Sequence, residues 1–180
     1  MNRFALGLVL LGTVIGSART ARAQIVGHDD RSWQEIVAVW ISGSLGPGSL
    51  AHEDGNPLAS ALRANVSVGP VLTTYRQDIV EPFESGNAVR DNALLVGVRS
   101  SGRRVFGSAA LGYSEARPYR KCDCFGTADE SKVHGMAYDV SAHANLVLFG
   151  ASLSFSGVAF APRANYFAAT VGLEAGWFGP

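Results

Sequence analysis

The chain has 180 residues, of which 47 % are hydrophobic and 17 % are charged, and its 15 Lys+Arg balance its 15 Asp+Glu. The length suits one domain, and without a basic surplus nothing predicts nucleic-acid binding. After the N-terminal segment, the apolar residues are dispersed rather than gathered into the run of roughly 20 that a membrane-spanning helix needs.

The N-terminus has the pattern of a secretory signal peptide. Arg3 precedes an apolar run over residues 4–16, and Ala21 and Ala23 occupy the small-residue positions of an Ala-x-Ala cleavage site. The run is well short of the roughly 20 residues of a spanning helix, so the pattern indicates export and cleavage. We therefore predict a signal peptide at residues 1–23.

The signal peptide divides the chain into three parts. A lead-in at residues 24–35 follows it, and a single domain is expected from residue 36 to residue 180. Without the three arginines of the signal peptide the exported chain keeps 12 Lys+Arg against 15 Asp+Glu, a net charge of about −3.

From residue 36 onward, apolar and polar residues alternate with a period of two, which is typical of strands that have different environments on their two faces. Clusters of Gly, Pro, Asn and charged residues separate eight such segments. The expected strands span residues 36–45, 59–68, 71–77, 92–99, 104–114, 134–143, 146–160 and 167–177.

The connections between these strands alternate in length. Short turns follow the second, fourth and sixth strands, and longer segments follow the others, above all residues 78–91 and 115–133, which we expect to be exposed loops. In an antiparallel stack all the short turns then lie at one end. This asymmetry is typical of outer-membrane barrels, which have short periplasmic turns and longer outer loops.

The stretches "AYDVSAHA" and "FAATVGLEAGW" carry a resemblance to the small eight-stranded bacterial outer-membrane barrels of the OmpA transmembrane-domain and OmpX type. The resemblance implies an all-β, antiparallel, up-and-down transmembrane β-barrel in the outer membrane of a Gram-negative-type bacterium. Membrane lipid and the barrel-assembly machinery are its implied partners. Phe167 and Trp177 are the implied assembly aromatics of the last strand, although three residues follow Trp177 here, whereas the family usually ends on its aromatic.

Five charged residues fall on the polar faces of the expected strands and would point into a closed barrel. An eight-stranded barrel encloses little more than packed side chains, and buried charges must be paired. We therefore predict an interior ion-pair network made by Arg63, Arg99, Arg104, Asp139 and Glu174.

Cys122 and Cys124 are the two cysteines of the chain, and both lie in the expected loop 115–133. In an oxidising compartment they can form a local disulfide, pair between molecules or bind a soft metal. A zinc ribbon needs a second cysteine pair, so we predict the local disulfide and no metal site.

The sequence contains no catalytic or cofactor-binding motif that we would assign. Ser141 and His143 form a Ser-x-His pair that resembles, in reverse order, the His-x-Ser pair of lipid A deacylase barrels. The alternation places both residues on the lumen face rather than the lipid face. We therefore predict no enzyme activity and no cofactor.

Two functional hypotheses remain. The first is an outer-membrane barrel with a structural or surface-interaction role, no open pore, and outer loops at residues 78–91 and 115–133 that contact envelope or extracellular partners. The alternative is a secreted, soluble barrel of lipocalin type that binds a small apolar ligand. In that barrel the polar face would be solvated and four aromatic residues would line the pocket: Phe149, Phe155, Phe167 and Trp177.

Overall fold

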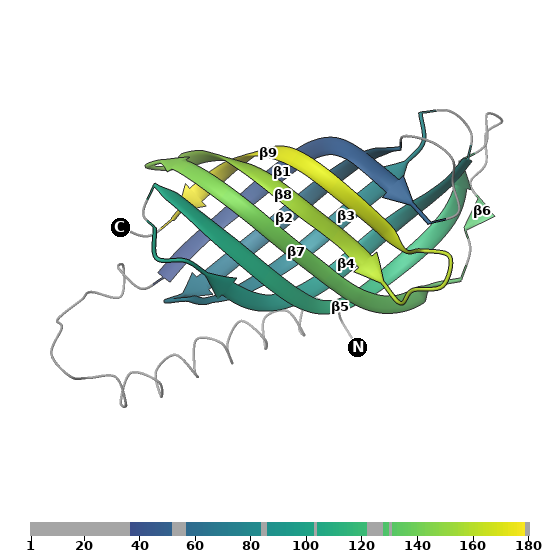
Figure 1. Cartoon of the computed structure of the whole chain (residues 1–180), viewed down its shortest axis with the longest axis horizontal. Helices are drawn as coiled ribbons and strands as arrows, with labels where there is room; N and C mark the ends of the chain where they lie inside the picture. Colours follow the sequence, from purple (N-terminus) through teal and green to yellow (C-terminus); the bar gives the residue numbers. More distant parts are fainter. Residues whose placement is uncertain are drawn as a thin grey trace, which may run out of the picture. The chain divides into compact units, whose positions relative to one another are not determined.

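A computed structural model describes the strand-forming part of the chain (Figure 1). The described residues are 37–51, 57–83, 86–102, 104–121, 128–129 and 131–178. The expected signal peptide (1–23), the lead-in (24–35), Cys122 and Cys124 lie outside these residues. Among the described residues, no helix is long and apolar enough to cross a membrane.

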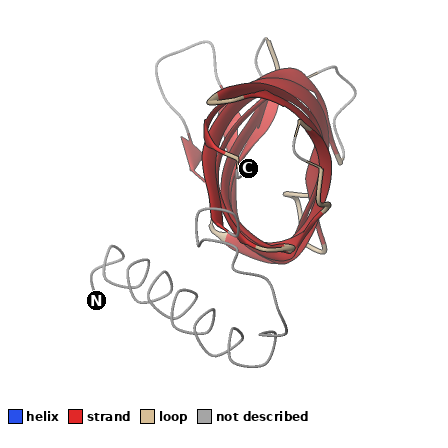
Figure 2. Ribbon diagram, turned by 90° about the vertical axis from the view of Figure 1, so that its left-hand side faces the viewer, coloured by secondary structure: helices blue, strands red, loops and turns tan. Residues whose placement is uncertain are grey.

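The described residues form one closed antiparallel sheet. Its strands are β1 (Val37–Leu50), β2 (Leu58–Val68), β3 (Val71–Glu81), β4 (Gly86–Arg99), β5 (Val105–Lys121), β6 (Ala128–Asp129), β7 (Val133–Leu146), β8 (Phe149–Ala159) and β9 (Tyr166–Trp177). The order is β4-β3-β2-β1-β9-β8-β7-β5, and a β4–β5 pairing closes the ring (Figure 2). The two-residue β6 pairs with the end of β5. The prediction of an eight-stranded up-and-down barrel is confirmed.

The two faces of the wall have opposite polarity. On β1, Ile41 is 57 % exposed and Leu45 is 60 % exposed, whereas Ser42 and Ser44 on the same strand are buried inside. The four aromatic residues that the lipocalin-type alternative needs inside also lie on the outer surface, from 43 to 70 % exposed. The apolar face of the wall therefore points outward. The lipocalin-type alternative, which needs the apolar face inside, is wrong on this point.

The connections between the strands lie at the two ends of the barrel. The "turn end" is the end at which β2 is followed by β3, β4 by β5 and β7 by β8, and at which β1 begins and β9 ends. The "loop end" is the opposite end, at which β1 is followed by β2, β3 by β4, β5 by β7 and β8 by β9. The two-residue turns after β2 and β7 and the longer connections after β1 and β5 follow the predicted alternation. The alternation is wrong in the middle of the chain, because the connection after β3 has four residues and the one after β4 has five.

The prediction of an exposed loop at residues 78–91 is wrong. Strand β3 continues to Glu81 and β4 begins at Gly86, so four residues connect them. Asp78 and Asp91, the two limits of the expected loop, are 1 % and 0 % exposed inside the barrel. Acidic residues usually mark solvated loops, but here a buried arginine pairs with both carboxylates.

Three other boundaries also move. Strand β1 continues to Leu50 rather than ending at residue 45. Strand β5 continues through Lys121, so the connection 115–133 is shorter than expected. The turn expected at residues 144–145 lies instead at Val147 and Leu148. In the last two cases the strand was expected to end where polar residues begin, at Glu115 and Arg117 on the outer face and at Asn145 in the lumen. The sequence pattern alone does not distinguish a polar turn from polar residues that continue a strand.

Val147 has a φ of 58° in the turn between β7 and β8. A β-branched side chain is disfavoured in this region, and a two-residue hairpin with positive φ at its first position prefers glycine there. Val147→Gly is therefore expected to raise the free energy of unfolding by about 1 kcal/mol. Urea unfolding in detergent would measure it, and a loss of stability would contradict the assigned turn geometry.

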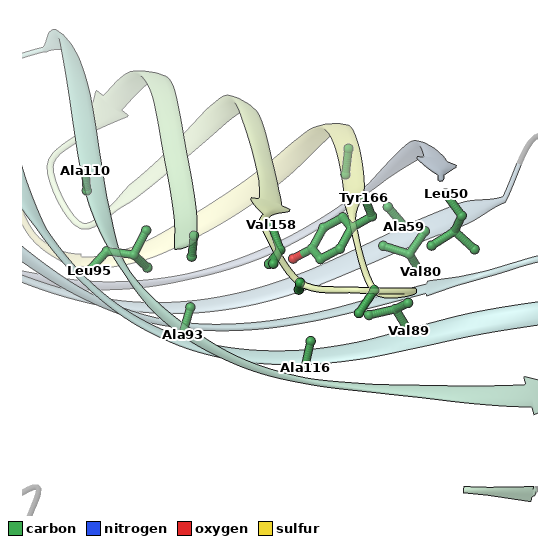
Figure 3. Close-up of a cluster of buried hydrophobic side chains, with 14 residues drawn as sticks. Leu50, Ala59, Val80, Val89, Ala93, Leu95, Ala110, Ala116, Val158 and Tyr166 are labelled. Carbon is green, nitrogen blue, oxygen red and sulfur yellow. The ribbon is translucent and has the colours of Figure 1, made fainter. Parts of the chain in front are cut away.

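The interior near the loop end is apolar. A cluster of buried side chains includes Leu50, Val80, Val89 and Tyr166 (Figure 3), and Ala161 and Ala164 of the β8–β9 connection join it. A second cluster at the turn end contains Ala38, Trp40, Leu72, Phe106 and Phe178. The first cluster continues toward the turn end on β4 and β5 through Ala93, Leu95 and Ala110, and most of the other buried side chains between the two ends are polar.

Candidate functional site

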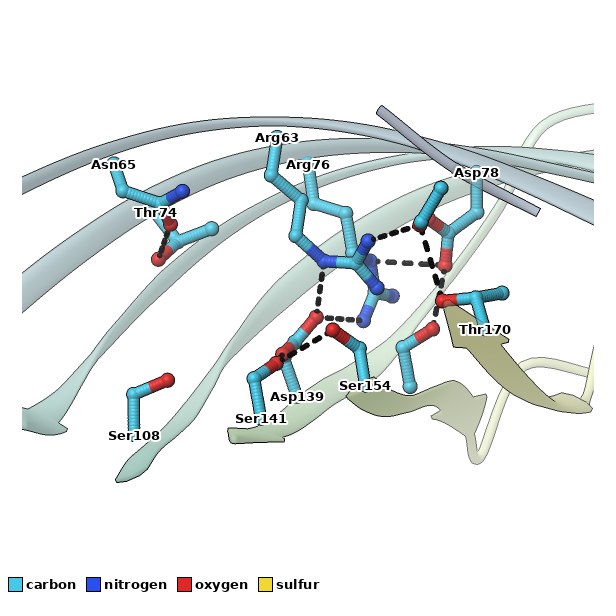
Figure 4. Close-up of polar contacts among 12 residues, drawn as sticks. Arg63, Asn65, Thr74, Arg76, Asp78, Ser108, Asp139, Ser141, Ser154 and Thr170 are labelled. Carbon is cyan, nitrogen blue, oxygen red and sulfur yellow. Dashed lines mark hydrogen bonds and ion pairs between the residues drawn. The ribbon is translucent and has the colours of Figure 1, made fainter. Parts of the chain in front are cut away.

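Arg76 of β3 occupies the centre of the polar layer and is fully buried (Figure 4). Its Nη2 atom lies 2.9 Å from Asp91 Oδ2, and its Nε atom lies 3.1 Å from Asp78 Oδ2. The guanidinium also donates to the carbonyl of Tyr138 at 2.6 Å and to Tyr166 Oη at 3.0 Å. One cation thereby connects strands β3, β4, β7 and β9.

The carboxylates around Arg76 have further partners. Tyr166 Oη lies 2.6 Å from Asp78 Oδ2 and 2.9 Å from Asp91 Oδ2. Ser156 donates to Asp78 at 3.1 Å, and Ser114 donates to Asp91. Buried carboxylates that lack such bonds would cost several kcal/mol each. The hydroxyl groups and Arg76 together replace the water that the two buried carboxylates have lost.

Arg63 and Asp139, both expected in the interior network, lie together in the same layer. Arg63 Nε donates to Asp139 Oδ2 at 2.7 Å, and Asp139 lies 3.8 Å from Arg76 Nη1. Arg63 also donates to Ser44, which donates to Thr170. The layer therefore spans the lumen from β1 to β7.

The other three expected network residues lie elsewhere. Arg99 sits at the turn end, where its guanidinium lies 4.2 Å from the Phe106 ring centroid and donates to Ser67 and to the Phe178 carbonyl. Arg104 is exposed in the turn before β5, because it falls outside the strand whose alternation would have turned it inward. Glu174 faces inward but pairs with His143 rather than with an arginine.

Sequence reasoning missed Arg76, Asp78 and Asp91, which form the centre of the network. A signal was present, since Arg76 and Asp78 alternate with Tyr75, Gln77 and Ile79 as inward residues alternate with outward ones. This signal was missed because the third strand was expected to end at residue 77 and the acidic residues after it were assigned to a loop.

His143 joins two residues from other strands. Its Nδ1 atom lies 2.9 Å from Glu174 Oε1, and its Nε2 atom lies 2.9 Å from Ser108 Oγ. Ser141, which the sequence analysis considered with His143, instead donates to Asp139 and Ser154. The Ser108–His143–Glu174 chain has the connectivity of a nucleophile, a base and an orienting acid.

The surroundings of these three hydrogen-bonded side chains do not suit a hydrolytic site. The His143 ring is stacked on Phe106, with centroids 4.3 Å apart, and meets Trp40 edge-on. Ser108 lies mid-strand, between partners on β4 and β7, where the ladder engages the backbone amides that an oxyanion hole would need.

Ser108→Ala tests these two interpretations. A structural role predicts a loss of about 1 kcal/mol in the free energy of unfolding, because the buried His143 nitrogen loses its hydroxyl partner. The wild type and the variant should hydrolyse a soluble p-nitrophenyl ester at equal rates, and neither rate should exceed that of spontaneous hydrolysis in buffer. Hydrolysis by the wild type that the variant lacks would contradict the structural role.

Phe167 and Trp177, the expected assembly aromatics, both lie on the outer face of β9. Phe167 is stacked on Phe155 of β8, with ring centroids 6.2 Å apart. Phe178, the residue after β9, turns inward and is buried beside Trp40. The last outward aromatic of the strand is therefore Trp177.

The loop end carries a shallow recess. It has a volume of about 410 Å³, and its lining includes Leu50, Val89, Pro118 and Tyr119. The described residues contain no group of three or more His, Cys, Asp or Glu side chains that could hold a metal ion.

No protein-family model matches the chain, and no curated protein matches it in sequence. Solved structures do match its fold. Neisserial surface protein A (NspA) aligns with a TM-score of 0.61 at 6 % identity, over 77 % of this chain and 96 % of that one. Ail, the attachment invasion locus protein of Yersinia pestis, aligns with a TM-score of 0.55 at 11 % identity, over 78 % and 98 %.

A third match is the N-terminal β-barrel domain of Pseudomonas aeruginosa OprF, with a TM-score of 0.54 at 8 % identity, over 77 % of this chain and 96 % of that one. Ail has also been solved in complex with the heparin analogue sucrose octasulfate. The identities are low, so these matches show the fold alone. At that level the resemblance to small eight-stranded barrels is confirmed.

Proposed function

We propose that this chain is an integral outer-membrane β-barrel of a Gram-negative-type bacterium, with a structural or surface-interaction role, no open pore and no enzyme activity. The observation that carries the proposal is the inverted polarity of the wall. Leu173 is 77 % exposed and Val171 is 65 % exposed on the outside, while Arg76 and Asp91 are fully buried. A nonaqueous surrounding favours that arrangement, because the apolar outer face is then not exposed to water. The closed barrel also leaves no backbone group unpaired in lipid.

In this proposal the turn end faces the periplasm and the loop end faces outward. The two-residue turns after β2 and β7 lie at the turn end, as do the start of β1 and the end of β9. They support this orientation, since exported barrels have short periplasmic turns. Membrane lipid and the barrel-assembly machinery are then the general partners, and Phe167 and Trp177 are the aromatics that the machinery would read.

We propose further that side chains plug the interior. The polar layer around Arg76 spans the lumen, and apolar clusters cover it at both ends. An ion crossing this interior would have to displace buried, paired charges, and separating such a pair is costly. The barrel therefore acts as a scaffold, and binding of envelope or extracellular partners falls to residues 82–85 and 122–132.

Heat modifiability tests the proposed location. The exported chain, refolded in detergent or taken from fractionated cell envelopes, should migrate faster on a gel before boiling than after it, and should be found in the outer-membrane fraction. A water-soluble monomer without a mobility shift would contradict the proposal. Ion conductance across a planar bilayer by the folded protein would contradict the plugged interior alone.

A further inference from the structure

Charged side chains on the outer face of the wall are confined to one side. In the described strands, the outward faces of β1, β2, β8 and β9 carry no Lys, Arg, Asp or Glu. Those of β3, β4 and β5 carry described charged side chains only near the loop end. The residues are Glu81, Arg90, Glu115 and Arg117, followed by Lys132 next to the start of β7.

Three of these residues form a "basic row" across neighbouring strands: Arg90, Arg117 and Lys132. Arg90 of β4 is the direct partner of Arg117 of β5. Val133 is the partner of Ala116, so Lys132, one residue earlier, lies beside Arg117. Neighbouring strands are about 4.8 Å apart, and like charges placed directly opposite each other destabilise a sheet.

One carboxylate partly compensates the basic row. Glu115 Oε1 lies 2.5 Å from Lys132 Nζ and 3.9 Å from Arg117 Nη2. Among the described residues, Arg90 forms no ion pair. The three cations of the row therefore pair with one acid, which leaves the row a surplus of two positive charges. Glu81, the other outward acid nearby, accepts a hydrogen bond from Tyr119 at 3.1 Å.

The basic row lies directly above the edge of the apolar wall. Four residues below it along the strands are Leu94, Tyr113 and Met136, which are exposed on the outside. In the row between, Asn92 accepts a hydrogen bond from Tyr75 Oη at 3.1 Å, and His134 Nδ1 contacts Tyr113 Oη. Tyrosines with an apolar ring and a bonded hydroxyl are typical of the level where hydrocarbon meets headgroups.

Four residues of a strand rise about 13 Å along the strand, and the strand tilt of about 40° in such barrels reduces this to roughly 10 Å along the barrel axis above the Leu94 level. Long arginine and lysine side chains at this height keep their stems along the apolar surface and their charges among polar headgroups. Their direction also matters. They project sideways from the wall, toward the surrounding leaflet, rather than upward with the loops.

We propose that the basic row binds the phosphate groups of anionic lipids in the leaflet that surrounds the loop end. Guanidinium groups bind phosphate oxygens through paired, charge-assisted hydrogen bonds, and a phosphate between Arg90 and Arg117 removes the repulsion between them. The inference rests on the proposed membrane location and adds to it a fixed lipid contact on the β4–β5–β7 side.

The experiment compares lipid retention by four proteins: the wild type, Arg90→Gln, Arg117→Gln and Arg104→Gln. Arg104 is an exposed arginine at the opposite end, so its variant controls for the loss of one positive charge. Each protein is refolded in dodecylphosphocholine micelles doped with phosphatidylglycerol. Bound phosphatidylglycerol is then counted by native mass spectrometry, and gel mobility is recorded with and without boiling.

Binding should weaken roughly fivefold for Arg90→Gln and for Arg117→Gln, since one basic residue at an anionic surface contributes about that factor. Arg104→Gln should bind as the wild type does, and salt should weaken binding in every protein.

Equal retention by all four proteins, with the mobility shift intact, would overturn the lipid contact alone. Displacement of the lipid by an equal concentration of inorganic phosphate would also overturn it, in favour of a soluble anion. A wild type without a mobility shift would overturn the proposed membrane location as well.

Discussion

Arg76→Ala is expected to lower the free energy of unfolding by about 3–5 kcal/mol, because it leaves the buried carboxylates of Asp78 and Asp91 without their cation. The effect should be larger than that of any exposed arginine. Urea unfolding in detergent, followed by the gel shift between folded and boiled protein, measures it. A folded fraction too small to titrate would agree with the upper part of this range.

Two further variants make this result specific. Arg104→Ala removes an exposed arginine and should change stability by no more than about 0.5 kcal/mol. Arg76→Met combined with Asp78→Asn and Asp91→Asn removes the charges together and should recover part of the loss, because no ion remains buried without a partner. A cost of less than 1 kcal/mol for Arg76→Ala would contradict the central role of the network.

Val171→Arg is expected to destabilise the barrel in a bilayer by about 2–4 kcal/mol. Val171 lies in the middle of β9, and its strand partners Leu45 and Leu153 are also exposed on the outer face. An arginine there must either be desolvated in hydrocarbon or deform the bilayer around it. Folding titrations in vesicles of a zwitterionic phospholipid measure the change.

The depth of the substitution provides the control. Val105 is also exposed on the outer face but begins β5 at the turn end, so Val105→Arg should cost only about 0–1 kcal/mol, as expected near an interface. Costs that are equal at the two positions, or near zero at both, would mean that water rather than lipid surrounds the wall.

The sequence predicts the local structure of this barrel well. Alternation with a period of two assigns most residues of the β1, β2, β7 and β9 walls to the correct face, and short turns such as Gly69-Pro70 fix the hairpins. Both signals act between neighbours along the chain or across a single turn. The assignment fails where charges are buried, because Asp78 and Asp91 have the composition of a loop and the environment of a core.

Contacts across the lumen need the closed barrel. The alternation predicts one network of five residues, and two of them, Arg63 and Asp139, form an ion pair. Two others do not join that pair, because Arg99 lies at the turn end and Arg104 lies outside β5. Which inward residues meet depends on the stagger with which the strands close. That stagger brings Arg76 of β3 to Tyr166 of β9, although 90 residues separate them in the chain.

By itself, then, the amino-acid sequence determined the number of long strands, the alternation of faces and the two-residue turns after β2 and β7, since these depend on residues that are near neighbours in the chain. The tertiary structure decided which charges became partners and where the basic row formed. Arg76 with Asp91, His143 with Glu174, and Arg90 beside Arg117 each depend on strand register. The physical reason is that a one-residue change of register would turn the side chains of a strand to the opposite face.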